Sequence, residues 1–130
     1  MKAVKITLAG RELYLAYTGE AMFQLQEKFG TAAELLESVV KNTREGLAAA
    51  CEAAAILAEQ GELARRYLGY DKGPIIDAET IRATITPSEI AALKLAIPAA
   101  MELGYGRDVV EDNDEVDLGL AELNAQKKTT

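Results

Sequence analysis

The chain has 130 residues, which fits a single domain, and its 14 Lys and Arg against 21 Asp and Glu give a net charge of −7. This charge repels phosphate and anionic lipid, so we expect neither a nucleic-acid partner nor a membrane partner. The absence of histidine removes the commonest general base and metal ligand, and the single cysteine forms no disulfide within the chain, as in a reducing compartment.

Residues 1–17 alternate apolar and polar side chains in two runs joined by Ala9 and Gly10. The apolar positions that share a face are Val4, Ile6 and Leu8 in the first run and Leu13, Leu15 and Tyr17 in the second. Such alternation on either side of a turn predicts a β-hairpin with one buried side. Because two strands alone are marginally stable, other elements must cover that side.

Capping residues and apolar periodicity predict helices along most of the remaining chain. The predicted helices span residues 18–29, 31–40, 43–60, 62–68, 77–84 and, after a cap at Thr86, 87–103. Gly61 is expected to end the helix before it, because glycine commonly terminates helices. The segment from Thr86 to Glu89 combines an N-cap, a proline at the first helical position and a capping-box glutamate. Pro98 is expected to kink the following helix or to split it in two.

The composition changes after residue 104. Residues 105–130 carry seven acids against three bases, a net charge of −4, and residues 1–104 carry the remaining −3. The acidic run 108–117 lacks a helical or strand period, which predicts a flexible linker. A small apolar cluster follows it, formed by Leu118, Leu120 and Leu123. We therefore predict a mainly α fold with a small N-terminal β-hairpin (α+β) over 1–104 and a flexible acidic tail over 105–130.

The acidic run also resembles a calcium-binding loop, but its spacing excludes that site. With Asp112 as the first ligand, the required glycine position holds Asp117 and the bidentate position holds Leu123. The helical acids fall on polar faces, and Cys51, on an apolar face, has no base to activate it. We predict no catalytic residue, no cofactor and no metal site, and so we expect that the protein is not an enzyme.

The order of three parts of the chain bears on its family. Residues 1–17 run into a helix that ends with the sequence EKFG at 27–30, and a small helical body follows. After the acidic stretch, the chain closes with DLGLAEL at 117–123 and QKKTT at 126–130. In this arrangement, which covers nearly the whole chain, the sequence resembles the tail assembly chaperones of long-tailed phages and prophages.

The resemblance implies a protein that works in the host cell cytoplasm and is absent from the mature virion. Such chaperones bind the long helical tape measure protein before the tube polymerises around it, and so act indirectly on the tail tube protein. Many are made in two forms by ribosomal frameshifting, and this chain resembles the short form. Residues 126–128 can be encoded by CAA-AAA-AAG, which contains a heptamer on which a ribosome can slip back one base.

A chaperone for an elongated amphipathic client needs apolar surface and a solubilising charge. We expect that surface on the alanine-rich helix over 43–60, on the helix over 87–103 and on the apolar cluster of the tail. The candidate partner-binding residues are Ala50, Ala54, Leu57, Ile97, Met101, Leu118, Leu120 and Leu123. The same helix faces equally suit an ordinary core, and a small core with alanine-rich faces also favours a homo-oligomer.

Two other classes of function remain open at this point. A structural head–tail or tail protein of the virion would also be small, acidic and helical, and it would be present in purified particles. A small regulatory adaptor would use its acidic tail to mimic nucleic acid, and it would compete with DNA for a basic partner.

Overall fold

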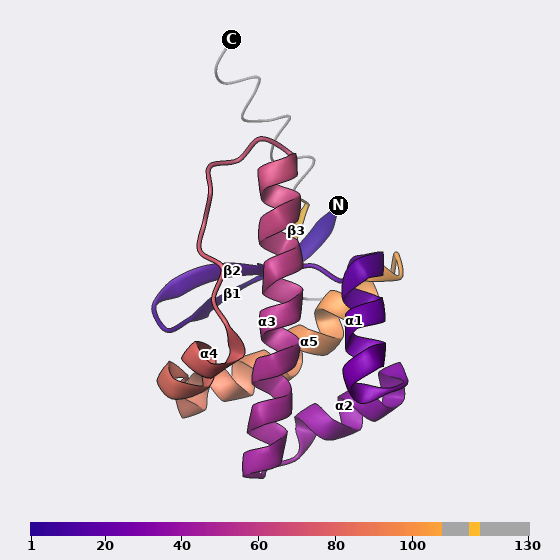
Figure 1. Ribbon diagram of the computed structural model, residues 1–130, viewed down its shortest axis with the longest axis vertical. Coiled ribbons are helices and arrows are strands. Elements are labelled where there is room, and N and C mark those ends of the chain that lie inside the picture. Colours follow the sequence, from indigo (N-terminus) through magenta and orange to yellow (C-terminus); the bar gives the residue numbers. More distant parts are fainter. Residues whose placement is uncertain (108–114, 118–130) are drawn as a thin grey trace.

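A computed structural model of the chain describes residues 1–107 and 115–117. The elements are β1 (Lys2–Leu8), β2 (Arg11–Leu15), α1 (Gly19–Phe29), α2 (Ala32–Val40), α3 (Arg44–Tyr67), α4 (Ala78–Thr84), α5 (Pro87–Gly104) and β3 (Glu115–Asp117). The long helix α3 stands at the centre, with α1 and α2 on one side, α4 on the other, and α5 crossing behind it (Figure 1). The predicted mainly α fold with an N-terminal hairpin is confirmed.

The hairpin pairs β1 with β2 in antiparallel register, with Ile6 opposite Leu13. Ala9 and Gly10 both have positive φ, 55° and 73°, as a two-residue type I′ hairpin turn requires. The twist of this turn matches the twist of the two strands. The predicted apolar face is buried at Val4, Ile6, Leu8, Leu13 and Leu15. Helix α3 packs against β2 and helix α5 packs against β1, so two helices cover the strands.

The acidic stretch contains a third strand, which the sequence analysis did not predict. β3 pairs antiparallel with β1, with Val116 opposite Ala3, so the sheet order is β2-β1-β3. A three-residue edge strand needs no apolar alternation, because the unpaired backbone groups along the free edge of β1 already favour pairing. The prediction of a flexible linker over 108–117 is therefore wrong at 115–117. Residues 105–107 of the predicted tail contact the helical body, with the Tyr105 ring against that of Tyr17, and the rest of the tail lies outside the described residues.

Helix α3 is one continuous helix of 24 residues, and the predicted break at Gly61 does not occur. A Cβ at Gly61 would lie 1.7 Å from the carbonyl oxygen of Tyr14, so the glycine marks a close approach between helix and strand. Nearby, the backbone N–H of Ala16 donates to the carbonyl oxygen of Leu57 over 3.1 Å. Gly61 is thus needed to seat the end of the hairpin on α3, and it does not end the helix.

The substitution Gly61→Ala is expected to destabilise the fold by at least about 2 kcal/mol, although alanine is the better helix former. Gly19→Ala is the matched control, because a Cβ at Gly19 would meet nothing within 4 Å. We expect that control to be neutral or stabilising by up to about 1 kcal/mol. Urea unfolding followed by circular dichroism measures both changes. Equal effects of the two substitutions would contradict the close approach.

Helix α5 begins at its predicted capping box and continues through Pro98 without a break, so the predicted split does not occur. The Glu89 carboxylate accepts the backbone N–H of Thr86 over 3.0 Å and that of Ala9 over 3.2 Å. One side chain therefore caps the helix and also holds the hairpin turn against it. This contact fixes where α5 starts relative to the sheet.

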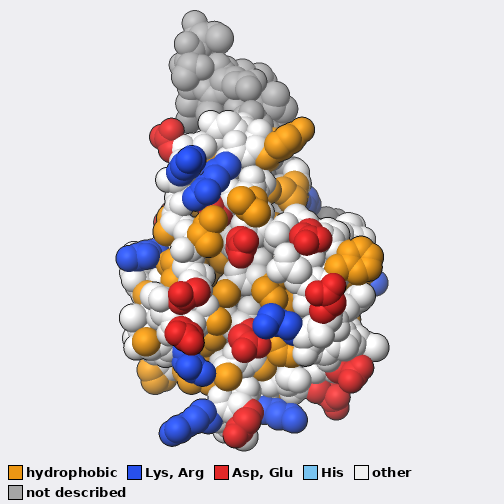
Figure 2. Space-filling view, viewed as in Figure 1, with side chains coloured by type: hydrophobic (Ala, Val, Ile, Leu, Met, Phe, Trp, Pro, Cys, Tyr) orange, Lys and Arg blue, Asp and Glu red, His pale blue; other side chains and the backbone are white. Residues whose placement is uncertain are grey.

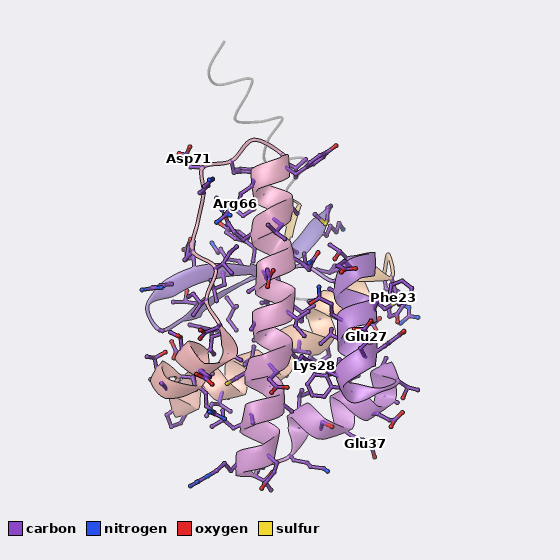
Figure 3. The ribbon with its side chains drawn as sticks, in the orientation of Figure 1. Phe23, Glu27, Lys28, Glu37, Arg66 and Asp71 are labelled. Atoms are coloured by element: carbon purple, nitrogen blue, oxygen red, sulfur yellow. The ribbon has the colours of Figure 1, made fainter. Side chains whose placement is uncertain are left out.

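Glu62 is the one buried charged residue among the described residues, with 5% of its surface exposed. Its carboxylate accepts hydrogen bonds from Arg65 over 2.6 Å, from Arg66 over 2.8 Å and from the backbone N–H of Gly73 over 2.6 Å. Figure 3 shows Arg66 pointing from α3 towards the connection that carries Asp71. The long connection between α3 and α4 is thereby tied to the upper end of α3.

Burial by itself raises the pKa of Glu62, but the hydrogen bonds from Arg66, Gly73 and Arg65 outweigh it and leave the pKa below its usual value. Glu62→Ala is expected to cost about 3 kcal/mol at neutral pH. Glu59→Ala, at an exposed position of the same helix, is the control and should change stability by less than about 0.5 kcal/mol.

Because its pKa is lowered on folding, the Glu62 carboxylate stabilises the fold above its unfolded-state pKa of about 4.3. This stabilisation is lost as the pH falls through the folded-state pKa. The difference in unfolding free energy between the native chain and Glu62→Ala should therefore shrink in acid, as measured by urea unfolding at several pH values. A difference that stays constant down to pH ~2 would contradict this role.

Candidate partner-binding groove

The five predicted partner-binding residues of the helical body lie in the core. Ala50, Ala54, Leu57 and Ile97 are 0% exposed and Met101 is 3% exposed. The remaining three candidates, Leu118, Leu120 and Leu123, lie outside the described residues. In this fold, contacts between the five core residues and a partner would require the core to open.

These side chains are buried because α3 is enclosed by its neighbours over most of its length. It packs against β2, α2, α4, α1 and α5, and its alanines allow these elements to come close. Alanine presents little side chain, so one helix can meet neighbours on several sides without leaving gaps. The smooth faces of α3 therefore serve packing within the domain.

A charge placed in this core is expected to unfold the domain. Ala54→Asp should cost about 4 kcal/mol or more, because the carboxylate would be buried without a partner. Ala33→Glu, at an exposed position of α2, is the control and should leave the melting temperature nearly unchanged. Thermal unfolding by circular dichroism distinguishes them. A folded Ala54→Asp protein with unchanged stability would contradict the assignment of this residue to the core.

A groove lies between the α2–α3 connection and α5, on the two helices that the sequence analysis had singled out. Its volume is about 440 Å³, within the range of small-ligand and side-chain pockets. Its described lining residues are Lys41, Asn42, Thr43, Arg44, Leu47, Ile90 and Lys94. Because α5 crosses behind α3 (Figure 1), residues about fifty positions apart in sequence meet there.

The wall formed by the start of α3 is fixed by two local features. The Thr43 side chain accepts the backbone N–H of Gly46 over 3.0 Å and so caps the helix. A Cβ at Gly46 would lie 2.0 Å from the carbonyl oxygen of Lys41, so only glycine allows the connection to turn this tightly. These contacts place Lys41 and Arg44 next to each other at the rim.

The opposite wall is α5, and Lys94 links it to the connection. The Lys94 ammonium donates to the side-chain oxygen of Asn42 and, over 3.4 Å, to the carbonyl oxygen of Val40. Ile90, one turn earlier on α5, and Leu47 on α3 supply the apolar part of the lining. The groove therefore combines an apolar floor with three cationic side chains around it.

The charge of this groove differs from that of the protein as a whole. Three of its described lining residues are basic and none is acidic, whereas the chain carries −7 overall. At the lower end of the molecule in Figure 2, where α3 begins in Figure 1, basic side chains lie on both sides of an acidic one. Val40, which directly precedes Lys41, is 54% exposed.

The described residues give no comparable support for a reactive thiol, a metal site or a membrane span. Cys51 is buried, and burial raises the pKa of its thiol against the opposing charge of Arg82, so the thiol stays protonated. In the described part of the chain, no three metal-ligating side chains of the His, Cys, Asp or Glu type come together. Within residues 1–107 and 115–117, each helix is too short or too polar to cross a bilayer.

The groove residues form no recognisable pattern in the sequence. Lys41 and Arg44 flank a helix cap, which in sequence is an ordinary polar connection. Only the fold brings Lys94 beside them.

Comparison with protein-family models, with curated proteins and with solved structures finds no match for this chain.

Proposed function

We propose that the chain is a tail assembly chaperone of a long-tailed phage or prophage, and not an enzyme. Its client in this proposal is the tape measure protein, held in the host cytoplasm until the tail tube polymerises around it. The observation that carries the proposal is the groove at Leu47 and Ile90, an open site with an apolar part and three cationic side chains in its lining. Such a site suits the apolar stripe of an amphipathic helix.

The remaining properties of the chain support a holding function. A net charge of −7 keeps a complex with an apolar client soluble. With no histidine in the sequence, the usual routes to acid–base and nucleophilic catalysis are missing.

Co-expression with the tape measure protein encoded by the same phage or prophage tests this function. We expect the two proteins to co-purify, and we expect mass spectrometry of purified particles to contain the tape measure protein without this chain. A constant copy number of the chain in purified particles would instead identify a structural virion protein. Displacement of the chain from its partner by DNA would identify the regulatory adaptor.

The coding DNA provides an independent test that needs no protein. We expect the heptamer at codons 126–128 and an open −1 frame that continues past the stop codon for the length of a domain. If both features are missing, this chain has no frameshifted longer form, and that part of the proposal is wrong.

A further inference from the structure

We infer that the groove between α3 and α5 binds an acidic amphipathic helix, with its apolar side chains on Leu47 and Ile90 and its carboxylates facing Lys41, Arg44 and Lys94. This inference rests on the proposed function only for the name of the client. The charge and shape of the groove carry the rest.

Charge complementarity selects the sign of the partner. The whole chain repels an acidic segment, since it carries −7, but the described lining of the groove is basic at three positions and acidic at none. Glu45 lies in the same first turn of α3 as Arg44 and is exposed, but it does not line the groove. The net charge therefore repels an acidic client, while the basic lining attracts it at the groove and favours binding there.

The apolar floor selects a helical partner over an extended one. An extended segment must find hydrogen-bond partners for its own backbone, and the interior backbone groups of α5, which forms one wall of the groove, are already paired. The opposite wall offers only the short connection 41–43 before α3 begins. A helix satisfies its own backbone and needs only apolar contacts along one stripe. Val40, which directly precedes the groove-lining Lys41, is exposed and adds apolar surface at that end of the groove.

Lys94 is already positioned for a carboxylate. Among the described residues it donates to Asn42 and to the carbonyl oxygen of Val40, and an ammonium has three donors. The third donor remains available to a partner. Because these contacts already restrict the side chain, less rotamer freedom is lost when an ion pair with the client forms.

Two synthetic helical peptides of about 20 residues test this inference, since that length spans about 30 Å. Both carry the same leucine stripe, and the flanking positions are glutamate in one and lysine in the other. By fluorescence anisotropy at low salt, the native chain should bind the acidic peptide at least about tenfold more tightly than the basic one. Added salt should weaken this binding.

The double variant Arg44→Glu/Lys94→Glu should reverse this preference. The control Arg11→Glu/Lys72→Glu makes the same change in net charge at exposed positions outside the groove and should keep the native preference. Circular dichroism confirms that both variants fold. An equal loss of acidic-peptide binding in both variants would show that net charge alone decides binding, and it would overturn the inference.

The outcomes separate this inference from the proposed function. If the native chain binds neither peptide, the groove assignment is wrong, while retention of the tape measure protein would still support a chaperone. If the acidic peptide binds through Arg44 and Lys94 but the tape measure protein is not retained, the groove assignment stands and the proposed function is wrong.

Discussion

The close approach between α3 and the end of the hairpin is the constraint on which the other contacts depend. At Gly61 there is no room for a Cβ beside the carbonyl of Tyr14, and the N–H of Ala16 donates to the carbonyl of Leu57. With β2 fixed on α3, β1 presents its remaining surface to α5. The central helix therefore organises both the sheet and the helix that packs on the other strand.

The groove follows from this arrangement. Glu89 ties the start of α5 to the hairpin turn, so the direction of α5 is set by the sheet that α3 holds. A second close approach, at Gly46, turns the chain sharply from α2 into α3. Lys94 on α5 then donates a hydrogen bond to Asn42 in the α2–α3 connection. Contacts outside the groove hold each of these two elements in place. A binding site on such elements is largely formed before a partner arrives.

Local signals predicted most of the fold, and failures occurred where long-range contacts decide. The helix caps at Thr31 and Thr86 can be predicted from the sequence because the residues that form each cap are close together in the chain. Gly61 was read as a helix end, since sequence alone does not reveal that a strand crosses there. The five partner-binding candidates of the helical body lie on the two helices that line the groove, but on faces that the neighbouring elements bury. The spacing of Glu62, Arg65 and Arg66 did carry an ion-pair signal, although the contact with Gly73 depends on the fold.

Our central claim is that the client binds in the groove of the folded domain while the core stays closed. Amide hydrogen exchange, measured with and without the bound tape measure protein, tests this claim most directly. We predict added protection at residues 40–47 and 90–95, around the groove, with protection at 50–57 and 97–101 unchanged. Faster exchange at 50–57 and 97–101 in the complex would contradict it, because the buried faces of α3 and α5 would then open to receive the client.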